Sequence, residues 1–296
     1  EEEFAVTNLM AWSPDSEYLT YVRFDESEVP EYSMQMWGNG LYPGYYNFKY
    51  PKAGEKNSKV TVHSYSVATK DIKELKVPVE GDYYIPRITF TTNSDQLAVM
   101  TLNRQQNVFN MYYVNPKSGV SRLILRDENK CYVDSEWLTS IHFNPSGFTY
   151  VSEQDGYSHI YLYSPTGVMQ RQVTKGNWDV TRLIGYDDAT KVVYYESAEE
   201  SPLRRSVYKI DQKGVKTKLS EGEGTNSADF SANYAYFVNN YSNANTPAVI
   251  TVNETKSKKV LRVLQDNAAL REKLANTSFS KKEFFKVHTA SDIELN

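Results

Sequence analysis

The chain repeats one short pattern of apolar and polar positions. An alternating stretch ends on a large apolar residue, a turn rich in Pro, Asp, Asn or Ser follows, and a second alternating stretch begins. In the clearest copy Trp12 precedes the turn at residues 13–16, and residues 18–22 alternate after it. Period-two alternation bounded by such turns predicts β-hairpins. Four weaker copies have these residues before the turn: Phe90, Phe143, Ile184 and Phe230.

The spacing of the copies predicts the architecture. The intervals between the five residues are 78, 53, 41 and 46 residues, and each also holds a second hairpin, such as residues 60–67 with 72–75. Four short strands per 40–50 residues are typical of β-propeller blades, which must stack to bury their faces. We therefore predict an all-β chain that forms a partial β-propeller of about five blades.

The first interval is longer than the others by about one hairpin. The surplus, residues 31–57, forms a predicted arm. An aromatic loop of this length either packs beneath itself or faces a partner, and the sequence leaves both open. Its aromatic residues are Tyr32, Trp37, Tyr42, Tyr45, Tyr46, Phe48 and Tyr50.

The last part of the chain has a different pattern. Residues 266–275 predict a helix with Asp266 or Asn267 as its cap, and residues 282–295 predict one more strand pair. The chain stops at Asn296 without a turn or cap, so we expect it to be a fragment.

Composition narrows the possible functions. A net charge of −4 argues against nucleic acid as a partner, since that requires a basic surface. No stretch is long and apolar enough to be a transmembrane span. The single Cys131 excludes an internal disulfide, and we expect it to be a small buried residue.

Catalytic and metal-binding motifs are weak. Ser158 and His159 lie in Gly-Tyr-Ser-His-Ile, where a nucleophile elbow requires a second glycine and a following helix, so we interpret them as a blade turn. The four histidines lie in different repeats without ligand spacing, and glycine-rich phosphate loops are absent. We therefore expect no metal and no cofactor.

A carboxylate cluster, Glu1-Glu2-Glu3, precedes the first repeat. One interpretation is a solvated charge run. The other is a pocket for an ammonium group, because two adjacent carboxylates can accept all three N–H bonds of a primary amine. The residues alone do not choose between the two.

Several motifs, in order, closely resemble the propeller domain of dipeptidyl peptidase IV and its bacterial relatives. The resemblance covers essentially the whole chain. The motifs lie at residues 1–4, 12–14, 24–33, 50–54, 156–161, 174–180 and 263–267.

The resemblance implies a serine exopeptidase of the prolyl oligopeptidase clan that removes N-terminal dipeptides with Pro or Ala in second place. It implies an eight-bladed propeller over an α/β-hydrolase domain that holds the catalytic residues. Residues 1–280 would then be the later blades, and residues 281–296 the start of the connection to the hydrolase. We expect the chain alone to be inactive.

The resemblance also implies site residues and partners. A Glu pair would bind the free N-terminus of peptide substrates: Glu1 with Glu2, or Glu2 with Glu3. The arm would join two subunits into a homodimer. The family's segment for extended substrate contacts has no clean counterpart between Trp137 and Phe148. An extracytoplasmic location, periplasmic or at the cell surface, follows from the family alone. The alternative function is a non-catalytic propeller that acts as a protein-binding scaffold.

Overall fold

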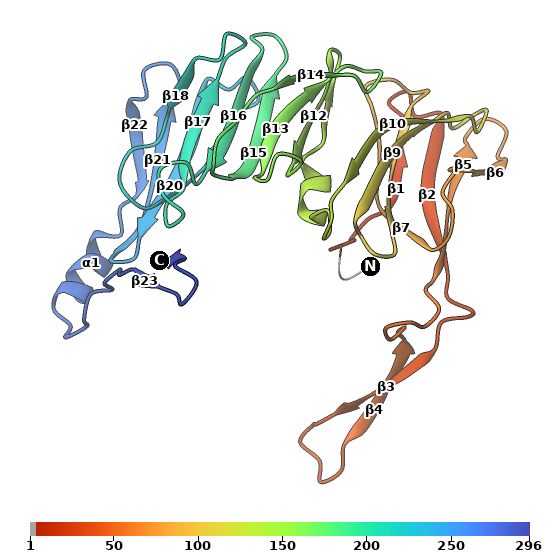
Figure 1. The fold of residues 1–296 in the computed structure, drawn as a ribbon, viewed down its shortest axis with the longest axis horizontal. Coiled ribbons are helices and arrows are strands. Elements are labelled where there is room, and N and C mark those ends of the chain that lie inside the picture. Colours follow the sequence, from red (N-terminus) through yellow and green to blue (C-terminus); the bar gives the residue numbers. More distant parts are fainter. Residues whose placement is uncertain (1–3) are drawn as a thin grey trace. The chain divides into compact units, whose positions relative to one another are not determined.

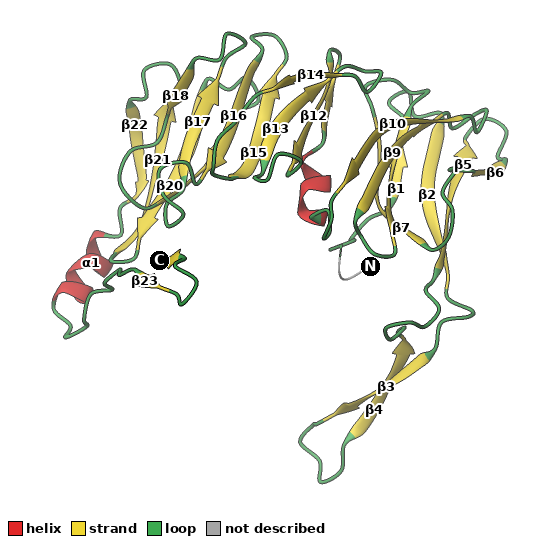
Figure 2. Cartoon of the chain, viewed as in Figure 1, coloured by secondary structure: helices red, strands yellow, loops and turns green. Residues whose placement is uncertain are grey.

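A computed structural model describes residues 4–296, and strands dominate it (Figure 2). The chain divides into two compact units, Glu1–Thr139 and Ser140–Asn296. A 3₁₀ helix, Ser135–Ser140, lies at the division.

The first unit contains two four-stranded antiparallel sheets and a two-stranded hairpin (Figure 1). The first sheet has the order β1-β2-β5-β6, with the strands Met10–Trp12, Tyr18–Asp25, Lys59–Ser66 and Ile72–Leu75. The second joins β7 to β10, which are Tyr83–Phe90, Leu97–Asn103, Val108–Val114 and Ser121–Glu128. The hairpin consists of β3, Glu31–Met36, and β4, Gly44–Lys49, inserted between β2 and β5.

The second unit contains three more four-stranded antiparallel sheets. The first joins β11 to β14, which are His142–Asn144, Gly147–Ser152, His159–Tyr163 and Met169–Gln172. The second joins β15 to β18, which are Val180–Asp187, Val192–Ser197, Ser206–Ile210 and Lys216–Lys218. The third joins β19 to β22, which are Thr225–Phe230, Tyr236–Asn243, Thr246–Glu254 and Val260–Gln265. Helix α1, Ala268–Ala275, and the strand pair β23, Val287–His288, and β24, Glu294–Leu295, follow.

The all-β class is confirmed, and the repeat pattern marks the sheets correctly. Trp12, Phe90, Phe143, Ile184 and Phe230 each lie in the first strand of a different four-stranded sheet. The helix and the final strand pair are also where the sequence predicts them. Helix α1 begins slightly late because Asn267 takes a left-handed conformation, with φ 52°, and the Asp266 carboxylate accepts the Ala268 N–H at 3.0 Å.

Alternating apolar residues hold neighbouring sheets together. In the first unit Val62 of β5 and Leu75 of β6 share a core with Leu97 and Val99 of β8. In the second unit the ring of Tyr194, in β16, stacks on Tyr234 at 4.4 Å. Within each unit, these neighbouring sheets thus bury one face of their strands against each other, as blades do.

Candidate functional site

The arm leaves its sheet through a charged neck. Strands β2 and β5 pair without interruption from Tyr18↔Ser66 to Asp25↔Lys59, and the hairpin β3–β4 continues from that end away from the sheet (Figure 1). At the neck Glu28 accepts hydrogen bonds from Lys59 at 2.5 Å and from Lys56 at 2.9 Å. These two bonds lower the pKa of Glu28 to about 2, so its carboxylate is ionised at neutral pH.

The strand register gives the arm one apolar and one polar face. Tyr32 pairs with Phe48, and Met34 pairs with Tyr46. Side chains alternate between the two faces of a strand. The apolar face therefore carries Tyr32, Met34, Met36, Tyr46, Phe48 and Tyr50, and the polar face carries Glu31, Ser33, Gln35, Tyr45, Asn47 and Lys49.

The aromatic rings of the apolar face contact one another, but most of their surface is exposed to solvent. The ring of Phe48 lies 5.4 Å from that of Tyr46 and 5.7 Å from that of Tyr32. Tyr46 is nevertheless 61% exposed, and at the tip of the arm Trp37 is 76% and Tyr42 88% exposed. Among the arm's predicted contact residues only Phe48 is half-buried, so packing of the aromatics beneath the loop does not describe this arm.

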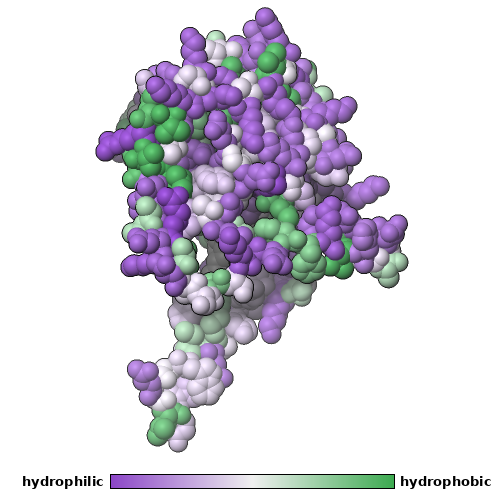
Figure 3. All heavy atoms as spheres, turned by 90° about the vertical axis from the view of Figure 1, so that its left-hand side faces the viewer, coloured by the Kyte–Doolittle hydropathy of each residue, from purple (hydrophilic) through white to green (hydrophobic). Residues whose placement is uncertain are grey.

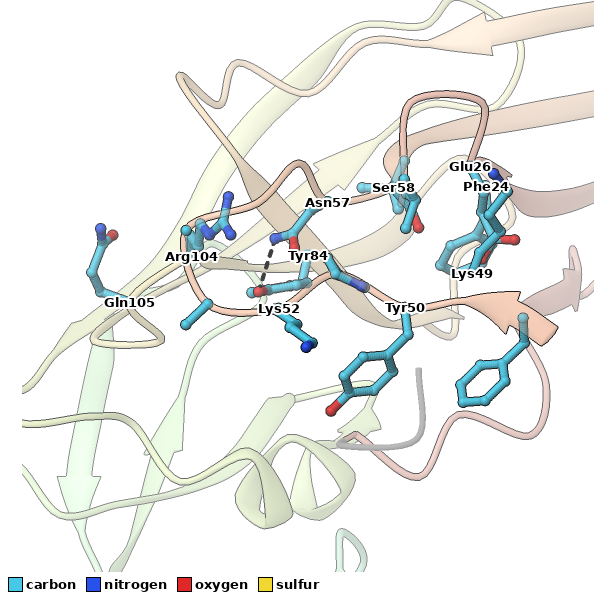
Figure 4. Close-up of a pocket in the computed structure, with 16 residues that line it drawn as sticks. Phe24, Glu26, Lys49, Tyr50, Lys52, Asn57, Ser58, Tyr84, Arg104 and Gln105 are labelled. Carbon is cyan, nitrogen blue, oxygen red and sulfur yellow. Dashed lines mark hydrogen bonds between the residues drawn. The ribbon is translucent and has the colours of Figure 1, made fainter. Parts of the chain in front are cut away.

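A groove lies at the base of the arm, within the first unit. This base groove has a volume of about 630 Å³, and Figure 4 shows the residues that line it. Asn57 Nδ2 donates to the Tyr84 hydroxyl at 3.0 Å, and the Arg104 guanidinium donates to Asp82 at 2.9 Å. The lining comes from β2, β4, β5 and β7, from the segments before β3 and after β4, and from the turn after β8, so no local motif reveals it.

The predicted ammonium-binding residues Glu1, Glu2 and Glu3 lie outside the described residues. The first described residue is Phe4, which is buried with its ring 5.2 Å from that of Tyr84. Tyr84 also lines the base groove. Phe4 therefore anchors the start of the described chain beside this groove.

Ser158 and His159 have structural roles where the turn at residues 154–157 leads into strand β13, which begins at His159. The Ser158 hydroxyl donates to Glu153 at 3.1 Å. Both ring nitrogens of the buried His159 are engaged, Nδ1 with the Thr174 hydroxyl at 3.0 Å and Nε2 with the Gly176 carbonyl at 2.9 Å. Because a carbonyl only accepts, Nε2 carries the proton and Nδ1 accepts from Thr174. His159 therefore has no free nitrogen with which to activate Ser158, in agreement with the prediction of a blade turn.

The remaining candidates do not assemble a chemical site. His63 stacks on Tyr21 with 5.3 Å between the rings and bonds the Thr61 hydroxyl at 2.9 Å. The expectation that Cys131 is buried is wrong: it is exposed, in the loop after β10.

Within residues 4–296, no group of three or more His, Cys, Asp or Glu side chains has the arrangement of a metal site. The helices in this range are also too short or too polar to cross a membrane.

Residues 4–296 form an all-β protein of repeated four-stranded antiparallel sheets, an arrangement typical of propellers. Residues 1–248 match the family model described as the dipeptidyl peptidase IV (DPP IV) N-terminal region. The chain belongs to that family, and the resemblance predicted from its motifs is confirmed.

Named relatives agree with this assignment. Dipeptidyl peptidase 4 of Trichophyton rubrum is 31% identical over the whole of this chain, which covers 40% of that relative. The crystal structure of Porphyromonas gingivalis dipeptidyl peptidase 4 is 58% identical with a TM-score of 0.95, over 99% of this chain and 42% of that one. A putative dipeptidyl aminopeptidase IV from Bacteroides ovatus is 25% identical with a TM-score of 0.75, over 90% of this chain and 40% of that one. The chain thus spans about two fifths of the length of these relatives.

Proposed function

We propose that the chain is the substrate-selecting and dimerising propeller part of a dipeptidyl peptidase IV-like serine exopeptidase, which releases N-terminal X-Pro and X-Ala dipeptides. The observation that carries the proposal is the match to Porphyromonas gingivalis dipeptidyl peptidase 4, at 58% identity over 99% of the chain. Related full-length peptidases hold this region together with a catalytic domain. The chain alone is therefore inactive, and its hydrolase domain is its first partner.

In this proposal residues 1–280 are about five blades of an eight-bladed propeller, and residues 281–296 begin the connection to an α/β-hydrolase domain. An exposed strand in the third sheet of the second unit supports the proposal that the propeller has further blades. Strand β22 is exposed along its whole length, including Val260, Leu261, Val263 and Leu264. Apolar side chains gather in green patches on this side of the unit (Figure 3). A further sheet of a longer protein would cover this face.

The proposed amine site uses two of the carboxylates Glu1, Glu2 and Glu3. Glu2 belongs to both possible pairs. The two carboxylates of the pair would neutralise the α-ammonium group of the substrate. Holding the N-terminus in this way would place the peptide bond after the second residue at the catalytic residues. The support from the described residues is that Phe4, which follows this run, is held against Tyr84.

The proposed dimer contact is the arm, residues 31–57, assisted by the hydrolase domain. A two-stranded hairpin cannot bury its own apolar face, and it becomes stable when further strands or another element cover that face. Tyr and Met are enriched in protein interfaces, and the apolar face of the arm consists of Tyr, Met and Phe. A twofold axis would pair this face with the second subunit.

On the family relationship alone, we infer an extracytoplasmic location for the whole enzyme, in the periplasm or at the cell surface. The proposal includes no nucleic acid, metal or cofactor.

The amine site is tested by the substitution Glu2→Ala in the full-length enzyme. We expect kcat/KM for Gly-Pro-p-nitroanilide to fall by about 1.5 to 3.7 powers of ten, because losing one partner of a desolvated charge pair costs on the order of 2–5 kcal/mol. The matched control is Glu17→Ala, an exposed carboxylate in the turn before β2 that should leave kcat/KM unchanged. Near-normal kinetics for a folded Glu2→Ala enzyme would identify the Glu run as solvated charge.

The alternative function, a non-catalytic propeller that binds proteins, predicts that no dipeptide is released by the full-length protein. Release of Gly-Pro from a peptide with a free N-terminus, but not from its acetylated form, separates the two functions in one assay.

A further inference from the structure

One end of the base groove is rich in hydrogen-bond donors. Figure 4 draws Lys52, Asn57, Tyr84 and Arg104 towards this end, whereas the carboxylate of Glu26 lies towards the other. The ammonium group of Lys52 lies 5.6 Å from the centre of the Tyr32 ring. Within residues 4–296, no ion pair within 4.0 Å includes Lys52. Its ammonium group thus has an aromatic face beside it, while the Glu55 carboxylate accepts the Lys52 backbone N–H at 2.7 Å.

The Tyr84 hydroxyl adds a directed donor. It accepts the hydrogen bond from Asn57 Nδ2 at 3.0 Å. A phenol has one proton to give, and a hydroxyl that already accepts a bond from an amide is free to direct that proton elsewhere. Tyr84 thus contributes an O–H donor on the same lining as Lys52.

Arg104 supplies positive charge in a fixed position. Its guanidinium binds Asp82 at 2.9 Å and also donates to the carbonyl of Glu55. Asp82 does not line the base groove, whereas Arg104 does. A guanidinium has five N–H donors, so donors remain after these contacts. An ammonium, a guanidinium and a phenol on one wall favour a carboxylate ligand.

We propose that this end of the base groove is a subsite for a carboxylate of the peptide substrate, downstream of the released dipeptide. The inference rests on the proposed function, because the substrate is the peptide that the exopeptidase would process. Phe4, which follows the proposed amine site, packs on Tyr84 of this same groove. The carboxylate comes either from an Asp or Glu side chain or from the C-terminus of a short peptide.

The test uses the full-length enzyme and hexapeptides that begin with Gly-Pro. One set carries a single Asp at the third, fourth, fifth or sixth position with an amidated C-terminus. A second peptide is neutral in its side chains and has a free C-terminus, and the reference is its amide. Release of Gly-Pro gives kcat/KM for each peptide.

We expect at least one carboxylate-bearing peptide to exceed the reference by about tenfold, the strength of a hydrogen bond to a charged group. The variant Lys52→Gln should return this ratio to near one, and Lys52→Arg should retain most of it. Gly-Pro-p-nitroanilide, which ends before the subsite, should be cleaved equally by all three enzymes. The matched control is Lys56→Gln, four residues away, whose ammonium binds Glu28 outside the base groove.

Three results would overturn the subsite. They are equal kcat/KM for all peptides, a ratio that survives in Lys52→Gln, and an equal loss on Gly-Pro-p-nitroanilide. A shift of the monomer–dimer equilibrium in Lys52→Gln, without a change in the ratio, would assign the groove to the dimer contact instead. If Gly-Pro-p-nitroanilide is cleaved and only the carboxylate effect is missing, the proposed function stands and this inference alone fails. If no substrate releases a dipeptide, both fail.

Discussion

The two faces of the arm allow a sharp test with neighbouring tyrosines. Tyr46 lies on the apolar face opposite Met34, whereas Tyr45 lies on the polar face opposite Gln35. The two side chains are similarly exposed, at 61% and 68%. If the apolar face joins two subunits, Tyr46→Ser should weaken the dimer of the full-length enzyme and Tyr45→Ser should not.

The size of the effect follows from the exposed area. A tyrosine side chain buries on the order of 200 Å² when it is covered, so about 120 Å² of Tyr46 is open to a partner. At about 25 cal/mol per Å² this area contributes about 3 kcal/mol. A twofold dimer uses the residue twice, which gives an upper limit of about 6 kcal/mol, or about four powers of ten in Kd.

The assay is a dilution series of each full-length variant, followed by light scattering and sedimentation velocity. Tyr46→Ser should be monomeric at concentrations where Tyr45→Ser and the parent enzyme are dimers. Deleting residues 36–48, which removes the outer half of the arm, should weaken the dimer at least as much. Equal Kd values for the two tyrosine variants, or an unchanged dimer after the deletion, would refute the role of this face.

Two further predictions concern Ser158 and His159. Residues 1–296 alone should not cleave Gly-Pro-p-nitroanilide. Ser158→Ala should leave kcat/KM of the full-length enzyme unchanged, since His159 has both ring nitrogens engaged in hydrogen bonds. Activity of the isolated chain that disappears with Ser158→Ala would contradict both expectations. His159→Ala should lower the free energy of unfolding by about 3 kcal/mol, because it removes two buried hydrogen bonds and leaves a cavity. Urea denaturation measures the change, with a substitution of the exposed His288, His288→Ala, as a control that should stay near the parent value.

The sheets could be predicted from the sequence because the repeat is local. Each copy carries its own alternation and its own turn, so Trp12 or Phe143 marks a first strand without knowledge of any other segment. The blade turn at Ser158 was predictable for the same reason, since the residue after His159 is the β-branched Ile160 and a strand follows.

The functional surfaces depend on features that the pattern does not contain. The seven aromatic residues of the arm form one group in the sequence, yet the register separates Tyr45 from Tyr46. The base groove needs Lys52, Tyr84 and Arg104, which come together only through the packing of two sheets. The residue type of Cys131 predicts a place in the interior, whereas its position in a loop beside Lys130 and Tyr132 leaves it exposed.

The arm is inserted between two paired strands, so its length and sequence can change without disturbing the sheet. The ladder from Tyr18 to Asp25 is complete without it, and Asp25 still faces Lys59 at the point where the chain leaves and returns. The two ends of the insertion are thus adjacent whatever lies between them, and closing a longer or shorter loop changes the free energy of folding only slowly with its length. If the arm is the subunit contact, as proposed, that contact can therefore be lengthened, exchanged or lost through changes in one short stretch of the gene, while the sheet that carries it keeps its fold.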